Sequence, residues 1–167
     1  MADVEFIDYS AEVIEGMEAA LIAGLEEAAG EIEAMTIRNS RQGHRYGDIL
    51  ATALWDKMVD EGAKEASVGS PYEAGYWEEF GTGEHALNGD GRKGWWVYVE
   101  GQDSGKGGKS YSSREEAEEA ALFLRRVKNL DAYATNGIDP NRPLHRAFSS
   151  AKPVVQAIFE DKLKGMG

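Results

Sequence analysis

Side chains suited to catalysis or to metal binding are few in this sequence. Its 167 residues include no cysteine and three histidines, His44, His85 and His145. None of the histidines has the close pairing of a helical zinc site, so we interpret all three as ordinary surface residues. The absence of cysteine excludes disulfides, thiolate ligands and thiol nucleophiles, and is typical of a protein assembled in a reducing cytoplasm.

Serine and glycine motifs give no catalytic or phosphate-binding site either. Ser67 and Ser70 stand near Gly69, but they do not form the Gly-x-Ser-x-Gly turn that exposes a serine nucleophile. The stretch from Gly101 to Gly108 is rich in glycine, but it lacks the strand-loop-helix spacing that aims backbone amides at a phosphate. We interpret it as a flexible hairpin tip.

Adjacent carboxylates are the remaining candidates for acid–base chemistry. Glu78 and Glu79 are neighbours in sequence, as are Glu115 and Glu116. Adjacent side chains on a helix point in different directions, so neither pair predicts a catalytic dyad, and we expect both pairs on solvated helix faces. The sequence therefore predicts a protein that is not an enzyme and that needs no cofactor or metal.

A dense aromatic group and a basic segment are better candidates for contact with a partner. The aromatic group consists of Tyr72, Tyr76, Trp77, Trp95, Trp96 and Tyr98. Packing in the core or at a subunit interface explains this group more simply than a ligand pocket does. Residues 39–47 are polar and basic, which predicts an exposed loop. The candidate interface residues are Arg41, His44, Arg45, Trp95 and Trp96.

The elements that must position these residues begin with a long amphipathic helix over residues 9–40. Its apolar face recurs every three or four residues, at Val13, Met17, Leu21, Gly24, Ala28, Ile32 and Met35. Gly16, Gly24 and Gly30 each weaken such a helix by about 1 kcal/mol relative to alanine. We therefore expect packing against neighbours, within the chain or between subunits, to stabilise it.

Residues 48–112 are expected to form a small antiparallel sheet with hairpins and a short helix. The segments 54–59 and 63–69 flank a turn, which predicts a hairpin. A short aromatic helix follows, from Ser70 or Pro71 to Phe80. Residues 95–100 predict a strand, and another short strand ends at Tyr111.

Residues 113–167 are expected to supply C-terminal helices packed on the sheet. Ser113 and Glu116 form a capping box that opens a helix. Residues 129–141 predict an irregular connection. A last helix begins near Arg142, and Pro153 should kink or restart it. The length suits one hydrophobic core, so we predict a single α+β domain over residues 1–167.

The net charge of −12 argues against general nucleic-acid binding, because it repels phosphates. Two interpretations of this charge stay open: solubility, and a negative surface past which DNA slides without sticking. The sequence contains no run of about 20 apolar residues, so it predicts no membrane span. The acidic N-terminus does not resemble a secretory signal.

The stretch Val68–Gly83, with the sequence VGSPYEAGYWEEFGTG, resembles a signature of the tail-completion family of siphophages and related prophages. Asn88–Tyr98 is similar to an insertion carried by many of its members. Asn141–Phe148 resembles the start of the family's last helix, with Leu144 and His145 in place of phenylalanine and leucine. Tyr46–Thr52 stands where the family has Thr-Gly-x-Leu-x-x-Ser.

The matching positions are expected to define the fold. They are Gly69, Tyr76, Trp77, Glu79, Phe80, Gly81, Thr82, Gly83, Arg142 and Pro143. Gly81 and Gly83 permit backbone conformations that bulkier residues resist, and Trp77 and Phe80 are expected to anchor the short helix against the sheet. We give none of these residues a catalytic role.

The resemblance implies a structural virion protein that completes the tail, or joins head and tail, of a long-tailed bacteriophage. Such a subunit is made in the host bacterial cytoplasm and forms a ring, with six copies expected, at the neck of the virion. Its implied partners are further copies of itself, head-completion or connector proteins, and the tail terminator or tail tube protein. Phage DNA passes through the lumen without specific binding, and lumen-facing carboxylates would prevent its adhesion.

Three other interpretations stay open. The chain takes another place in the neck, as the tail terminator or the head-completion stopper. Alternatively, it is a small hydrolase or nucleotide-processing enzyme that uses carboxylates and His145. The third interpretation is an acidic DNA mimic that inhibits a host protein and is absent from particles.

Overall fold

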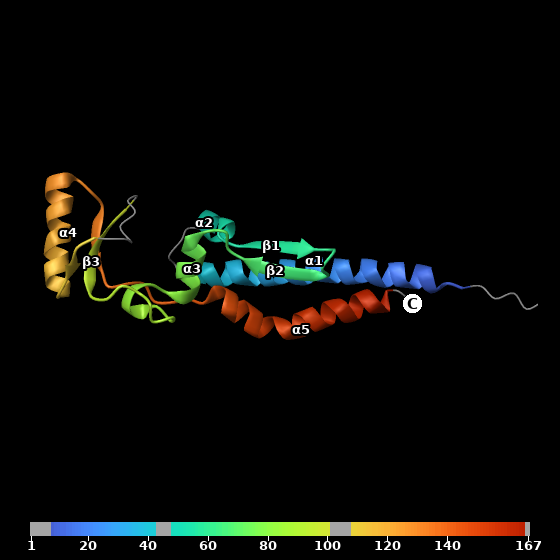
Figure 1. The fold of residues 1–167 in the computed structure, drawn as a ribbon. Helices are drawn as coiled ribbons and strands as arrows, with labels where there is room; N and C mark the ends of the chain where they lie inside the picture. The colour runs from blue at the N-terminus through green and yellow to red at the C-terminus, as the bar shows by residue number, and fades with distance from the viewer. Residues whose placement is uncertain (1–7, 43–47, 101–107, 166–167) are drawn as a thin grey trace, which may run out of the picture. The chain divides into compact units, whose positions relative to one another are not determined.

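Helices and strands both occur in the computed structural model, which describes residues 8–42, 48–100 and 108–165 (Figure 1). The predicted α+β class is confirmed: a long N-terminal helix, two small antiparallel sheets and C-terminal helices are present. The chain forms two compact units, which we call unit 1 (residues 1–75 and 143–167) and unit 2 (residues 76–142). No helix in the described ranges is long and apolar enough to cross a membrane.

Unit 1 is built on two long antiparallel helices, α1 (Ser10–Gln42) and α5 (Pro143–Lys164). Near the end of α1, the Asn39 side chain donates a hydrogen bond to the Pro143 carbonyl at the start of α5, at 3.0 Å. The short helix α2 (Asp48–Ala53) precedes an antiparallel hairpin of β1 (Asp56–Asp60) and β2 (Glu65–Gly69). Figure 1 shows the hairpin and α5 both lying along α1.

The packing between α1 and α5 gives a role to a glycine. Ile32 of α1 is buried with Ala147 and Ala151 of α5. Farther along, the Phe159 ring lies over Gly24, where an added Cβ would come within 2.5 Å of the ring. A residue that lowers helix propensity therefore makes room for an aromatic side chain, and the packing offsets the weakness.

One local prediction in unit 1 is wrong. Residues 39–42 belong to α1 instead of a loop, because Ser40 is buried and its hydroxyl accepts a hydrogen bond from Trp55 Nε1 at 2.7 Å. The rest of that predicted loop, residues 43–47, lies outside the described ranges, as does the predicted hairpin tip at 101–107. Helix α5 continues through Pro153 as one helix, so of the two expected outcomes, a kink or a restart, the restart does not occur.

Unit 2 contains a three-stranded antiparallel sheet covered by one helix. Helix α3 (Glu73–Phe80) leads into it, followed by the 3-10 turn η1 (Gly83–His85). The strands β3 (Trp95–Val99), β4 (Ser110–Tyr111) and β5 (Ala132–Thr135) pair in the order β4-β3-β5. Helix α4 (Arg114–Lys128) packs on β3 and β5, and its Ala121 is buried with Val99 and Ala132.

The ends of α4 can be predicted from the local sequence, but strand β5 cannot. The Ser113 hydroxyl accepts a hydrogen bond from the Glu116 N–H at 3.2 Å, which confirms the predicted cap. Asn129, with φ of 51°, ends the helix in the left-handed region. The prediction of an irregular connection over 129–141 is wrong at β5, because this short, alanine-containing strand is recognisable only through its pairing with β3.

Candidate functional site

Two backbone segments of unit 2 meet directly after α3. The Thr82 N–H donates to the Ile138 carbonyl, and the Glu84 N–H donates to the Asn136 carbonyl, each at 2.9 Å. Gly83 has φ of 62°, and a Cβ on it would lie 2.1 Å from the Asn136 carbonyl oxygen. Gly81 is similar, with φ of 74° and the Ile138 carbonyl oxygen 2.7 Å from its Cβ position. These glycines therefore permit a close approach to residues 136–138, a segment that sequence analysis did not connect to them.

In helix α3, two adjacent carboxylates are buried, whereas Tyr76 and Trp77 are exposed. Glu78 is 0% exposed and Glu79 8%, whereas Trp77 is 43% exposed. The Asn141 side chain donates to Glu78 Oε1, and the Asn141 N–H donates to the Glu78 carbonyl at 2.9 Å. The expectation of solvated glutamates at 78 and 79 is thus wrong, because a residue distant in sequence provides a polar partner. Trp77 does not anchor the helix as expected.

Most of the other positions that match the family signature make contacts within the fold. The exposed Tyr76 packs its ring against Phe80, with centroids 4.8 Å apart. The Thr82 hydroxyl accepts a hydrogen bond from the Ile138 N–H at 3.0 Å. Arg142 has φ of 55°, and Pro143 is buried at the first position of α5, where its missing N–H costs nothing. At Gly69 no atom lies within 4 Å of the position that a Cβ would take, so packing does not explain why this residue is glycine.

His85 belongs to a polar cluster beside the same glycines. Its Nδ1 lies 2.7 Å from Asp139 Oδ1, and its Nε2 lies 3.4 Å from Asn136 Oδ1. The Gly94 N–H donates to Glu84 Oε1 at 3.1 Å, and this bond, with one from the Asn136 side chain, holds the pKa of Glu84 below its ordinary value. His85 is therefore not the ordinary surface residue predicted. Both ring nitrogens face side chains of the opposing segment, so the cluster ties residues 84–85 to 136–139.

The predicted interface residues lie in different environments. Arg41 donates to the Thr52 hydroxyl at 2.8 Å in unit 1. Trp96 is only 9% exposed, so it serves the packing of unit 2 and does not form an open surface. Trp95 is half-buried, with the Arg114 guanidinium 5.8 Å from its ring centroid. His44 and Arg45 lie outside the described ranges.

Among the residues that the structure describes, no group of three or more histidine, aspartate or glutamate side chains is placed to hold a metal ion. No known protein family, curated protein or solved structure matches this chain. The functional site must therefore be inferred from the surfaces of the protein itself. Exposed His145, at the start of α5, belongs to no such group in these ranges.

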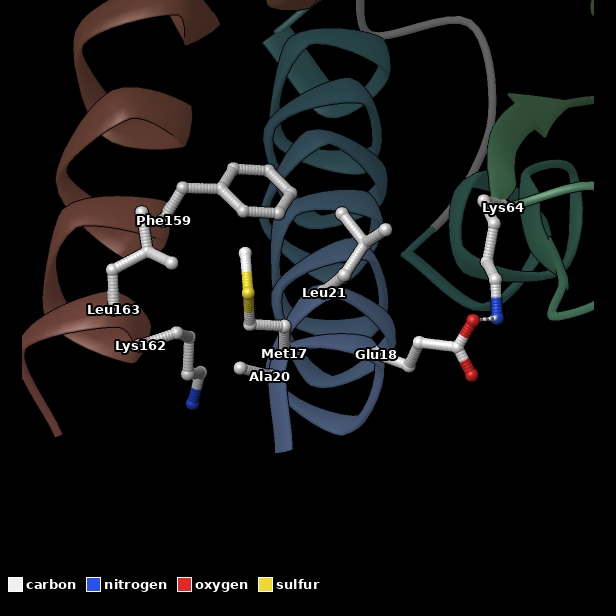
Figure 2. Close-up of a pocket in the computed structure, with 8 residues that line it drawn as sticks. All are labelled: Met17, Glu18, Ala20, Leu21, Lys64, Phe159, Lys162 and Leu163. Atoms are coloured by element: carbon white, nitrogen blue, oxygen red, sulfur yellow. Dashed lines mark ion pairs between the residues drawn. The ribbon is translucent and has the colours of Figure 1, made fainter. Parts of the chain in front are cut away.

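An open apolar hollow lies on unit 1, beside the N-terminal half of α1 (Figure 2). Its volume is about 450 Å³, and its apolar lining comes from Met17, Ala20, Leu21, Phe159 and Leu163. Figure 2 shows Phe159 reaching from α5 toward α1, and Lys64 paired with Glu18. Both long helices thus contribute to one apolar concavity.

The hollow continues into an exposed apolar stripe on α1. The stripe consists of Val13, Ile14, Met17 and Leu21, whose exposed fractions range from 38% to 59%. Contiguous exposed apolar surface of this kind marks interaction sites. Sequence periodicity located this apolar face, but it could not show that the described residues leave the first half of the face exposed. The hollow and the stripe together are the candidate functional site.

The charged residues of α1 are acidic over most of its length. Residues 10–37 contain seven glutamates and no lysine or arginine. Farther along the helix, Lys57 pairs with Glu26 at 3.0 Å and Lys162 pairs with Glu27 at 2.6 Å. Glu12 and Glu15 have no such partner within the described ranges, but they lie on the opposite side of α1 from the stripe. The charged residues that line the hollow are Glu18, Lys64 and Lys162, and each of them is in an ion pair, so the candidate site is apolar with paired charges at its edge.

Proposed function

We propose that this chain is a structural subunit of a long-tailed bacteriophage, which completes the tail or joins it to the head as part of a ring at the neck. The observation that carries the proposal is the exposed apolar stripe of α1, with the hollow beside it. A subunit whose function is assembly needs such a surface, because burial in an interface removes the apolar area from water.

The signature segment supports the proposal in a different way. Gly81 and Gly83 allow the crossing with residues 136–138, and the buried Glu78 is held by Asn141. These are contacts that maintain a fold. They agree with the resemblance of this segment to the tail-completion family, in which we expect the signature to be structural.

The net charge of −12 fits the same proposal. A ring around a DNA channel benefits from carboxylates on its lumen, because they repel phosphates and let DNA pass during packaging and ejection. Replacing lumen-facing acids with lysine should slow ejection. Unchanged ejection kinetics would remove the lumen hypothesis without affecting the position of the subunit.

Cryo-EM of particles assembled with this chain tests the position. We expect a ring of this subunit between the head-completion proteins and the tail tube, and we expect cells that lack the gene to accumulate separate heads and tails. Density at another level of the neck would identify a tail terminator or a stopper. Absence of the chain from particles would contradict the proposal and would favour an inhibitor of a host protein.

A further inference from the structure

The dipeptide Asn-Gly occurs twice in unit 2, at Asn88-Gly89 and at Asn136-Gly137. In this dipeptide the glycine nitrogen can attack the asparagine side chain, because glycine has no Cβ to hinder the approach. A bond forms between the glycine nitrogen and the asparagine Cγ, the Cγ–Nδ2 bond breaks, and ammonia leaves with the proton of the glycine nitrogen. Water then opens the cyclic imide to aspartate or isoaspartate. Both dipeptides are therefore candidate sites of spontaneous deamidation.

Asn136 is held on both sides of the bond that would break. Its Nδ2 donates to Glu84 Oε2 at 3.3 Å, and its Oδ1 lies 3.4 Å from His85 Nε2. The attacking nitrogen, that of Gly137, donates to Thr135 Oγ1 at 3.0 Å. The Asn136 carbonyl also accepts from the Glu84 N–H at 2.9 Å, as part of the backbone crossing. Ring closure would need these contacts to open together, because the side chain must turn toward its own backbone.

Asn88 lies in an exposed turn with fewer restraints. Its Nδ2 donates to the hydroxyl of the exposed Tyr76 at 2.7 Å, and the Gly89 N–H donates to the Ala86 carbonyl at 3.0 Å. No atom lies within 4 Å of the position that a Cβ on Gly89 would take. Opening this turn breaks two hydrogen bonds at the surface and leaves the crossing intact. Local opening of such surface segments costs little free energy.

We infer that Asn88 is a site of spontaneous deamidation in the folded protein, and that the backbone crossing protects Asn136 from the same reaction. A structured site reacts through its open form, so a tenfold difference in rate corresponds to about 1.4 kcal/mol of additional opening free energy. The inference concerns the chemistry of unit 2 and does not depend on the proposed function.

The products have different consequences at the two positions. Aspartate at position 136 would replace the Nδ2 donor with a carboxylate oxygen that faces the carboxylate of Glu84, and like charges at this distance repel. Aspartate at position 88 can accept a hydrogen bond from the Tyr76 hydroxyl, so the contact survives. The reactive dipeptide thus stands where its product is tolerated, and the protected one where it is not.

Incubation of the full chain at mildly alkaline pH, followed by peptide mass spectrometry, measures both reactions. In the folded chain, aspartate and isoaspartate should accumulate at position 88 at least about tenfold faster than at position 136. In guanidinium chloride the two positions should react at similar rates, because each asparagine precedes a glycine and neither contact set survives. The comparison with the unfolded chain separates protection by structure from the effect of the neighbouring residues.

Two variants identify the cause of each rate. Thr135→Val removes the acceptor of the Gly137 N–H and should raise the rate at position 136 by about tenfold, with no change at position 88. Gly89→Ala places a Cβ beside the attacking nitrogen and should lower the rate at position 88 by about tenfold, with no change at position 136. Circular dichroism melting should confirm that both variants fold.

A second measurement compares the products directly. Asn136→Asp should lower the midpoint of thermal unfolding by several degrees, whereas Asn88→Asp should leave it nearly unchanged. The protection of Asn136 would be overturned if both positions reacted equally fast in the folded chain. An Asn88 that stayed unmodified under conditions that modify the unfolded chain would overturn the assignment of the reactive site. Neither result bears on the tail-completion proposal.

Discussion

The two units hold their parts together by different kinds of contact. In unit 1, side chains make the contacts between elements: Phe159 fills the space above Gly24, and lysines from neighbouring elements pair with glutamates of α1. In unit 2, the backbone does more, since the segments at 81–84 and 136–138 approach too closely for side chains at the signature glycines. Unit 1 should therefore tolerate small repacking that unit 2 cannot, because a flexible side chain moves more easily than a paired backbone.

The largest effect is expected at the backbone crossing of unit 2. Gly83→Ala places a Cβ 2.1 Å from a carbonyl oxygen at a positive φ, so we expect a loss of about 3 kcal/mol in the free energy of unfolding. Gly89→Ala, also at positive φ but in open space, should cost about 1 kcal/mol. Urea denaturation followed by tryptophan fluorescence measures both. Equal losses in the two variants would mean that the positive φ alone, and not the close approach of residues 136–138, accounts for the cost of replacing Gly83.

A smaller loss is expected where a side chain provides the obstacle. Gly24→Ala should destabilise unit 1 by about 2 kcal/mol, because the Phe159 ring must shift although helix propensity improves. Gly30→Ala meets only Lys57 Nζ at 3.5 Å, an ordinary contact, and should stabilise by up to about 1 kcal/mol. Thermal melts of the two variants should therefore shift in opposite directions. Stabilisation by both would show that the ring over Gly24 contributes nothing.

Loss of a helix cap should have a still smaller effect on unit 2. Ser113→Ala removes the acceptor of the Glu116 N–H and should cost about 1 kcal/mol. Ser113→Asp keeps an acceptor at the N-terminus of α4 and should stay close to the unaltered protein. Hydrogen exchange of the first turn of α4 reports the change locally. If the aspartate variant exchanged as fast as the alanine variant, the cap would not be the cause.

Opposite pH dependence of the two units is the smallest expected effect. The pKa of Glu84 is lowered from 4.5, chiefly by the Gly94 N–H, so its contribution to unit 2 is present above pH 4.5 and is lost as pH falls through the lower folded value. The pKa of Lys162 is raised from 10.5 by its bond to Glu27, so its contribution to unit 1 is present below pH 10.5 and is lost as pH rises through the higher folded value.

Two variants separate these contributions. Glu84→Gln should reduce the loss of stability on acidification, and Lys162→Met should reduce the loss on alkalisation. Both groups are exposed, so the effects should be small and should shrink with added salt. If both variants altered the stability at the same end of the pH range, the two ion contacts would not contribute separately to the two units.

Local sequence predicted the elements whose signals are local. The apolar period of α1, the turn between β1 and β2, and the Ser113 cap of α4 are each contained within a few residues, and all three are present. Strand β5 was missed because its partner is β3. The burial of Glu78 was missed because Asn141, 63 residues away, supplies the hydrogen bond. No local pattern identifies such pairs.

The candidate site shows the same division. Periodicity placed Val13, Met17 and Leu21 on one face of a helix, and this is correct. Their exposure depends on how far the packed part of α5 covers α1, which no feature of α1 itself determines.

The chain leaves unit 1 at Gly75, beside Leu54, and re-enters it at Pro143, beside Asn39. Both connections therefore lie near the C-terminal end of α1, which has a consequence for changes of length. Seen from unit 1, residues 76–142 are an excursion that begins and ends at neighbouring points. Changing the length of such an excursion costs little loop-closure entropy, since each doubling adds only about 0.6 kcal/mol. Insertions or deletions within residues 76–142 should therefore alter unit 2 while leaving the packing of α1 against α5 intact.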